Sequence, residues 1–273
     1  MCTATLVPLA QGGARLLHNR DEQRDRPPAT NLRATAHAAY PIDPVSSGTW
    51  AAISRYGLAF ALLNRNPQPA HELPRPQNAH SRGAVIPGML DAPSLDDVVL
   101  RFDALDAERF MPFDLIALDA AHALTLTWMG PGFGGRRAPR FHTIQPGTPP
   151  TLWSSSGLGD DVVEADRQAA FARAFSPSPA DWPDQQTILH RSFSPGREFA
   201  GFCMHRQDAR TVSQTELLVT PDKLELTYRL WNDGAHAPAP GSDPASPSPA
   251  TAQHASLTPV GAARGPHPRA RLA

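Results

Sequence analysis

Hydrophobic and polar residues alternate along several short stretches of the chain, and turn residues join these stretches in pairs. Cys2–Leu9 alternates in this way, and the turn Ala10-Gln11-Gly12-Gly13 leads into a second alternating stretch, Ala14–His18. Alternation with a period of two around a Gly-rich turn predicts a β-hairpin. The same pattern predicts three more hairpins: Thr49–Ser54 with Leu58–Asn64, Phe113–Asp119 with Leu124–Trp128, and Thr211–Val219 with Lys223–Trp231.

Helical periodicity occurs between the hairpins. Ser94 and Asp97 form a typical N-terminal cap, and apolar residues follow at helical spacing as far as Leu105. Further helices are predicted for Ser81–Leu90, Asp161–Phe175 and Asp181–Arg191. Because antiparallel hairpins alternate with blocks of helix, we expect an α+β fold and not a parallel βαβ array.

The composition changes at about Asn232. From Gly234 to Ala273 the chain is rich in Ala, Pro, Ser and Gly and has almost no large apolar residues. Such a segment buries too little surface to offset the entropy lost on ordering. We therefore predict one folded domain over residues 1–233 and a disordered tail over residues 234–273.

Charge and cysteine content argue against several classes of protein. The 273-residue chain has a formal net charge of −1, which gives no indication of nucleic-acid binding or of an anionic membrane partner. Its two cysteines cannot form a disulfide framework and suit a reducing compartment. No apolar run approaches the roughly eighteen residues of a membrane span, and the N-terminus lacks the pattern of a signal peptide. We expect a cytoplasmic protein, and no protein partner is indicated.

The candidate chemistry begins at Cys2, which directly follows the initiator Met1. If Met1 is removed, Cys2 carries a thiol and a free α-amine, whose pKa of about 7.7–8.0 lets it act as base for the thiol. Arg20 would then favour the thiolate and lower the thiol pKa below about 8.5, and Asp21 would orient the amine. A simpler interpretation is that Cys2 is a small buried residue at the start of a strand.

Four short motifs occur in order over the first part of the chain: Met1-Cys2-Thr3, Asn19-Arg20-Asp21-Glu22, Ser47-Gly48-Thr49-Trp50 and Ala61-Leu62-Leu63-Asn64. This series resembles the NRDE family, also called the transport and Golgi organisation 2 family, a branch of the N-terminal-nucleophile hydrolases. The resemblance is dense over residues 1–65 and returns at Asp208–Val212. It implies a four-layer αββα sandwich of two antiparallel sheets, with the N-terminus at the end of a central strand.

The resemblance also implies roles for individual residues. Cys2 would attack a carbonyl carbon, Arg20 and Arg210 would favour the thiolate and the oxyanion, and Asn64 would donate its amide into an oxyanion hole. The substrate would lie beside Asn19, Thr49 and Trp50.

Simpler alternatives exist for three of these residues. Asn64 is also a typical turn former at the end of a strand. Arg210 could form a surface ion pair with Asp208, and Trp50 could belong to the core. In addition, Ser154-Ser155-Ser156-Gly157 stands where the family often has a Ser-Asn pair, so one amide donor is missing.

No metal ion or organic cofactor is required for this chemistry. The run Gly130–Gly135 has the spacing GxGxxG, but Arg136-Arg137-Ala138-Pro139 blocks the helix that a dinucleotide site needs. A metal site formed by Cys2, His18, Cys203 and His205 can be imagined, but metal-type spacing occurs only once among them. A buried Cys203 and a surface His205 are the simpler interpretation.

We therefore interpret the chain as a cysteine hydrolase of a non-peptide amide or related acyl compound. The alternative is a protein that binds its ligand in the same cleft without turnover. The resemblance supports this alternative, because members of the family are linked to haem handling and to lipid or acyl-CoA homeostasis, and haem would then be a ligand.

Overall fold

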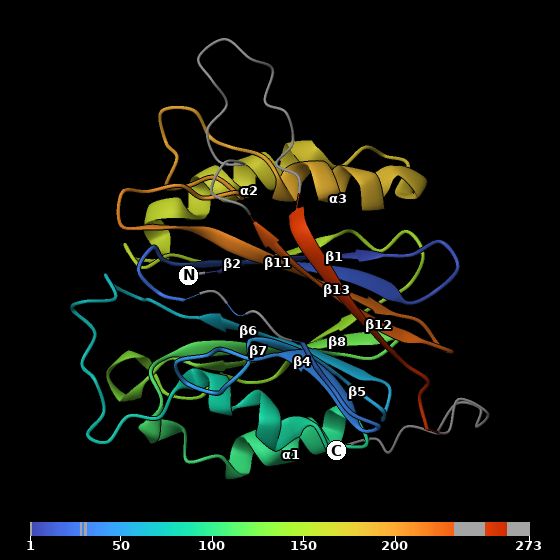
Figure 1. Ribbon diagram of the computed structural model, residues 1–273, viewed down its shortest axis with the longest axis horizontal. Coiled ribbons are helices and arrows are strands. Elements are labelled where there is room, and N and C mark those ends of the chain that lie inside the picture. The colour runs from blue at the N-terminus through green and yellow to red at the C-terminus, as the bar shows by residue number, and fades with distance from the viewer. Residues whose placement is uncertain (1, 28, 30–31, 232–248, 261–273) are drawn as a thin grey trace.

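The computed structural model describes residues 2–27, 29, 32–231 and 249–260, and it stacks two β-sheets face to face between two layers of helices (Figure 1). The predicted α+β class and αββα arrangement are confirmed. All four predicted hairpins are also present, although several strands are longer or shorter than the alternation indicated.

The first sheet contains the N-terminal hairpin. Among the described residues its strand order is β10-β1-β2-β11-β12-β13, and every neighbouring pair is antiparallel. The strands are β1 (Cys2–Pro8), β2 (Ala14–Gln23), β10 (Thr151–Ser155), β11 (Ala209–Val219), β12 (Leu224–Trp231) and β13 (Pro249–Leu257). Since β1 lies between β10 and β2, Cys2 begins an internal strand and is opposite Arg20 on one side and Ser155 on the other.

The second sheet follows the chain more simply, in the order β3-β4-β5-β6-β7-β8-β9. Its strands are β3 (Leu32–Ala34), β4 (Ala38–Pro41), β5 (Ala51–Ser54), β6 (Leu58–Asn64), β7 (Phe113–Leu118), β8 (His122–Trp128) and β9 (Arg140–Thr143). The apolar inner faces of the two sheets meet in one core, to which Ala4, Leu16, Ile53 and Leu226 contribute.

Helices cover the outer faces of both sheets (Figure 1). The first sheet is covered by α2 (Asp161–Ala174) and α3 (Trp182–His190), and the second by α1 (Leu95–Ala104). As predicted, α1 begins after Ser94, whose Oγ accepts a hydrogen bond from the Asp97 backbone N–H at 3.1 Å. The remaining short helices are η1 (Arg82–Ala84), η2 (Ile86–Met89), η3 (Ala107–Arg109), η4 (Pro131–Phe133) and η5 (Pro179–Asp181).

The predicted short helix Ser81–Leu90, expected to be interrupted near Pro87-Gly88, is present as two successive 3-10 turns, η1 and η2, and not as an α-helix. Pro87 removes a backbone donor at this point, which interrupts the ladder of an α-helix. Across the part of the chain that the structure describes, no helix has both the length and the apolar character to cross a membrane.

The predicted disordered tail needs a correction. Residues 234–248 and 261–273 lie outside the described residues, but β13 pairs with β12 along the edge of the first sheet. Ala255 of β13 is buried in the core between the sheets. The composition did not reveal this strand, because its side chains are small. Backbone hydrogen bonds of the ladder, and not large apolar residues, hold it in place. The folded unit therefore extends beyond residue 233.

Candidate active site

A cavity of about 380 Å³ opens where β1 begins and where β2 and β6 end. The turn before β5 and the segment around η1 complete its wall. The residues on which its chemistry depends are Cys2, Arg20, Asp21, Glu22, Arg26, Asp43, Thr49, Trp50, Asn64, Arg75, His80 and Arg82. The structure thus brings six of the eight predicted site residues together: Cys2, Arg20, Asp21, Thr49, Trp50 and Asn64.

Cys2 is held at the base of this cavity by its neighbour on β10. The Cys2 backbone nitrogen donates to Ser155 Oγ at 3.0 Å, and Ser155 Oγ lies 3.4 Å from the Cys2 carbonyl oxygen. Both residues are buried. Ser155, which the sequence marked only as a missing amide, therefore positions the nitrogen that becomes an amine when Met1 is removed.

With Met1 in place, the pKa of the Cys2 thiol is raised, whereas the lowered pKa was predicted for the mature chain. Burial raises the pKa of the Cys2 thiol above its ordinary value, and the Asp21 carboxylate adds to the rise. The positive charge of the N-terminus, then the charge of Arg20 and a backbone hydrogen bond from Asp21, act in the opposite direction, but they do not overcome the burial.

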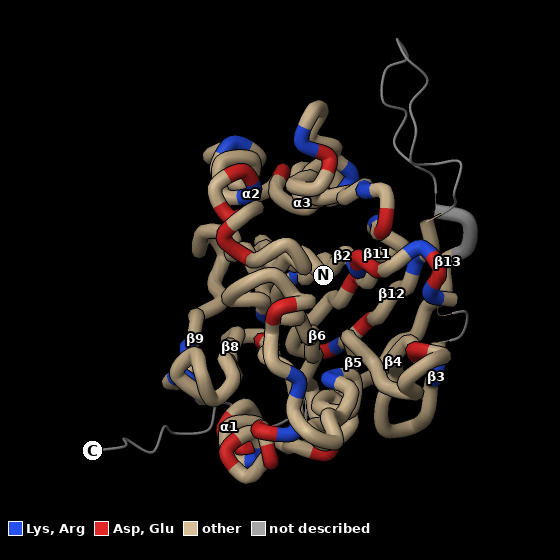
Figure 2. The backbone as a smooth tube through the Cα atoms, turned by 90° about the vertical axis from the view of Figure 1, so that its left-hand side faces the viewer, with Lys and Arg blue, Asp and Glu red and all other residues tan. Residues whose placement is uncertain are grey.

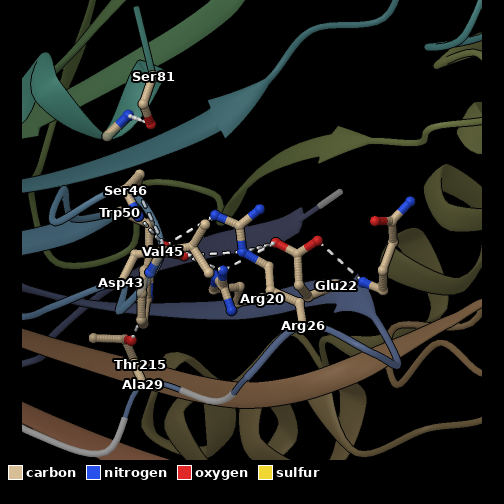
Figure 3. A network of polar contacts seen from close by, with 12 residues as sticks. Arg20, Glu22, Arg26, Ala29, Asp43, Val45, Ser46, Trp50, Ser81 and Thr215 are labelled. Atoms are coloured by element: carbon tan, nitrogen blue, oxygen red, sulfur yellow. Dashed lines mark hydrogen bonds and ion pairs between the residues drawn. The ribbon is translucent and has the colours of Figure 1, made fainter.

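Arg20 is a weak activator of the thiol because two carboxylates already neutralise its charge (Figure 3). Its Nη2 lies 2.7 Å from Asp43 Oδ2 and 2.9 Å from Glu22 Oε2. Arg26 joins the same network, with its Nη2 2.9 Å from Asp43 Oδ1. Although burial alone would raise the pKa of Asp43, hydrogen bonds from Arg26 and from the Ser46 backbone hold it below its ordinary value. The Arg20 guanidinium also stacks 4.5 Å from the centre of the Trp50 ring.

Asp21 forms a second buried polar cluster, on the side of the first sheet that faces α2. Thr211 Oγ1 donates to Asp21 Oδ1 at 2.6 Å, and Arg167 Nη2 lies 3.9 Å from Asp21 Oδ2. Arg167 is fully buried on α2 and donates to Ser154 Oγ at 2.9 Å and to the Ser155 carbonyl oxygen at 3.0 Å. Burial raises the pKa of Asp21, while the Arg167 charge opposes the rise.

Asn64 is half-buried at the end of β6 and lines the cavity. Its side-chain amide makes no hydrogen bond to any residue that the structure describes, so its N–H groups can donate to a ligand. Thr49 and Trp50 are more constrained. Thr49 Oγ1 donates to the Ala51 carbonyl oxygen at 2.8 Å, and Trp50 Nε1 donates to Thr215 Oγ1 at 3.1 Å. These two side chains shape the cavity wall and belong to the core as well.

Two predicted site residues lie elsewhere. Asn19 Nδ2 donates to the carbonyl oxygens of His190 at 2.7 Å and Phe202 at 2.9 Å, so Asn19 joins the sheet to the helical layer. Asn19 shares a face of β2 with Asp21 but lies two residues further from the end of the strand, where the cavity opens. Arg210 is opposite Glu22 in the sheet but does not line the cavity. Burial and the positive charge of Arg24 lower the pKa of Arg210.

The sequence interpretation missed Arg82, which stands at the start of η1 on the cavity wall. Its Nη1 donates to the Pro112 carbonyl oxygen at 3.1 Å. Burial lowers the pKa of Arg82 to about 10, and the Glu22 carboxylate, together with Cys2 when it is ionised, opposes this shift. The only local signal was Ser81, whose Oγ caps η1 through the Gly83 backbone N–H.

Within the described ranges, no group of three or more His, Cys, Asp or Glu side chains is placed to hold a metal ion. Cys203 is buried, and burial raises the pKa of its thiol to about 12.

Comparison with known proteins gives the same picture of the fold. The family model described as Transport and Golgi organisation 2 matches residues 14–144. The structure is similar to that of a Caenorhabditis elegans N-acylethanolamine-hydrolyzing acid amidase ortholog, with a TM-score of 0.50 and 12% sequence identity over 80% of this chain and 92% of that chain. The C2A mutant of conjugated bile acid hydrolase from Clostridium perfringens matches with a TM-score of 0.44 and 10% identity over 83% and 88%. No curated protein has a matching sequence. The chain has an N-terminal-nucleophile hydrolase fold.

Proposed function

We propose that the chain belongs to the transport and Golgi organisation 2 family, whose model matches residues 14–144, and that it is a cysteine hydrolase of a non-peptide amide or related acyl compound. The observation that carries the proposal is the position of Cys2, whose nitrogen is bonded to Ser155 Oγ at the base of a cavity that Asn64 also lines. The similar fold of an amidase supports an amide as the substrate class.

The first half of the reaction forms a thioester. After removal of Met1, the α-amine of Cys2 takes the thiol proton, and the sulfur attacks the substrate carbonyl carbon. The carbonyl π electrons move to oxygen, where the Asn64 amide donates a hydrogen bond to the negative charge. When the tetrahedral intermediate collapses, the carbon–nitrogen bond breaks, and the ammonium proton passes to the leaving nitrogen.

The second half releases the acid. The α-amine, again neutral, takes a proton from water, and the resulting hydroxide attacks the thioester carbonyl carbon. The carbon–sulfur bond breaks and the sulfur recovers the proton from the ammonium group. Each cycle thus consumes one water and leaves the amine and thiol as they began.

Burial of the thiol explains why a local base is needed. Because burial raises the pKa of Cys2, little thiolate exists at neutral pH, and an internal proton acceptor must create it in the reaction. The hydrogen bond to Ser155 Oγ orients the nitrogen of Cys2. Arg167 lies behind this pair and fixes the Ser155 backbone through its carbonyl oxygen.

The test is acylation of the mature protein by p-nitrophenyl butyrate, followed by intact-mass spectrometry. We expect a chain that lacks Met1 and that carries one butyryl group on Cys2, with release of p-nitrophenol. Cys203→Ala should acylate normally, whereas Cys2→Ala should not acylate. Retention of Met1, or labelling that survives Cys2→Ala, would rule out the nucleophile.

A binding protein without turnover is the second candidate, and the raised pKa of the Cys2 thiol favours it. On this alternative, haem or an acyl-CoA would occupy the cavity as a ligand, and Arg75 and Arg82 would face its anionic groups. Stoichiometric binding of haem or butyryl-CoA, with no acylation of Cys2, would replace the hydrolase proposal. A cytoplasmic location forms part of both proposals and rests on the two free cysteines.

A further inference from the structure

The charged residues of the cavity divide into a neutralised set and an unneutralised set. Arg20 and Arg26 form ion pairs with Glu22 and Asp43, so this four-residue network has no net charge (Figure 3). Asp21 has Arg167 on the side away from the cavity wall. The negative charges of the cavity are therefore already matched by arginines.

Arg82 and Arg75 make up the unneutralised set. Neither has a carboxylate within ion-pair distance among the residues that the structure describes, although both line the cavity. They are close enough to repel each other, and the Arg75 charge contributes to the lowered pKa of Arg82. Two neighbouring cations at a cavity, one of them half-buried, are unfavourable unless an anion joins them.

Arg82 also has donors to spare. One nitrogen, Nη1, donates to the Pro112 carbonyl oxygen, and this bond fixes the plane of the guanidinium. A guanidinium has five N–H donors in a rigid fork, which matches the two oxygens of a carboxylate. The remaining donors of Arg82 make no hydrogen bond to a residue that the structure describes, and Arg82 lines the cavity.

The backbone that carries Arg82 is fixed in place. The Thr49 backbone N–H donates to the Gly83 carbonyl oxygen at 3.0 Å, and Ser81 caps η1. Gly48 and Gly83 approach so closely that a Cβ on Gly48 would lie 2.6 Å from the Gly83 carbonyl carbon. Arg82 is thus positioned before any ligand arrives, which reduces the entropy cost of binding.

We propose that Arg82 and Arg75 bind a carboxylate group of the substrate, so that the site selects N-acyl compounds that carry a carboxylate over neutral amides. The proposal rests on the hydrolase function only for the cleavage of the bound compound, because binding of its carboxylate requires no catalysis. Arg82 acts as a specificity residue that holds the substrate by a group distant from the reacting carbonyl.

The experiment measures binding without turnover. Calorimetric titration of Cys2→Ala protein uses two probes of equal size, N-butanoylglycine and its neutral counterpart N-butanoylglycinamide. We expect the carboxylate probe to bind roughly 10- to 100-fold more tightly, as a charge-assisted hydrogen-bonded pair requires. Adding Arg82→Gln should bring the ratio of the two dissociation constants close to one. Equal binding of the two probes, or binding of neither, would overturn the proposal.

Matched variants separate a local effect from a general one. Arg101 of α1 donates to the Gly88 and Asp91 carbonyl oxygens outside the cavity, so Arg101→Gln should preserve the preference. Arg75→Gln changes an exposed side chain and serves if Arg82→Gln fails to fold; it should reduce the preference several-fold. A preference that survives both cavity variants would place the anion elsewhere.

Turnover of the same probes by the mature protein distinguishes the two proposals. If the carboxylate probe binds selectively but is not hydrolysed, the anion site stands and the hydrolase function fails. If both probes are hydrolysed with equal kcat/KM and Arg82→Gln slows both equally, Arg82 acts on the reacting carbonyl and the anion site fails.

Discussion

At the scale of single residues, the surroundings of Cys2 matter more than its place in the sequence. Arg20 lies on the neighbouring strand, as its sequence position predicts, but its ion pairs with Glu22 and Asp43 weaken its effect on the sulfur. Burial is therefore the largest influence on the thiol and keeps it protonated. A hairpin pattern can place two residues side by side, but it cannot reveal which third residue neutralises one of them.

The raised thiol pKa predicts how Cys2 reacts with iodoacetamide. Because only the thiolate reacts, alkylation should be slow at neutral pH and should keep accelerating above about pH 8.5. Arg20→Ala removes a positive charge that lowers the thiol pKa, so the profile should shift further toward high pH. Mass spectrometry of the labelled peptides over a pH series measures this. An inflection below pH 7 would contradict the role assigned to burial, and Cys203, with a pKa of about 12, should stay unlabelled.

Ser155 gives a second prediction at this scale. Ser155→Ala removes the oxygen that accepts the hydrogen bond from the Cys2 nitrogen. The loss of one such bond is worth about 1 kcal/mol, so acylation of Cys2 should slow roughly fivefold, with little change in melting temperature. Ser156→Ala is the control, since its Oγ accepts from the Leu158 backbone N–H and does not touch Cys2. Equal rates in the two variants would show that Ser155 is dispensable.

At the scale of elements, two features of the site could not be read from periodicity. The alternation of β2 fades after His18, yet the strand runs to Gln23 because Arg20 and Asp21 find partners on each face of the sheet. On α2 the apolar side chain of Val162 is exposed, whereas the charged side chain of Arg167 is buried. Hydrophobic patterning assigns charged residues to the surface, so a buried ion pair such as Arg167 with Asp21 escapes it.

The contact between Gly48 and Gly83 joins the turn before β5 to η1, and it can be tested separately from the chemistry. A methyl group at residue 48 would collide with the Gly83 backbone, so Gly48→Ala should lower the free energy of unfolding by about 1–3 kcal/mol. Gly88→Ala is the matched control, because a Cβ at that position has no atom within 4 Å. Urea denaturation of the two variants provides the comparison. Equal stability would show that the two segments can move apart.

At the scale of the whole molecule, the sequence predicted the layers but not the edges of the sheets. Large apolar residues at regular spacing revealed the four hairpins, and these form the middle of both sheets. The strands that escaped prediction, β3, β4, β9, β10 and β13, all lie at or near sheet edges. Edge strands bury only part of their surface and need fewer large apolar residues, so the pattern that marks a central strand is weak in them.

The last described segment, residues 249–260, adds β13 to the first sheet and also forms hydrogen bonds to the second sheet. Gln253 Oε1 of β13 accepts a hydrogen bond from the Leu32 backbone N–H at 2.6 Å, and the Val260 backbone N–H donates to the Arg55 carbonyl oxygen at 2.7 Å. Both partners belong to the second sheet or its turns. In Figure 2, β13 and β3 lie along the same side of the molecule, which agrees with this connection.

The contribution of this segment to stability can be measured at two neighbouring residues of β13. Ala255 is buried between the sheets, whereas Ser256 is exposed and is opposite Glu225 in the ladder. Ala255→Lys places a charge against apolar side chains and should lower the free energy of unfolding by about 1–3 kcal/mol. Ser256→Lys adds the same side chain on the solvent face, next to a carboxylate, and should leave stability nearly unchanged. If thermal unfolding gives the two variants the same melting temperature, β13 does not hold the sheets together, and residues beyond 233 contribute nothing to the fold.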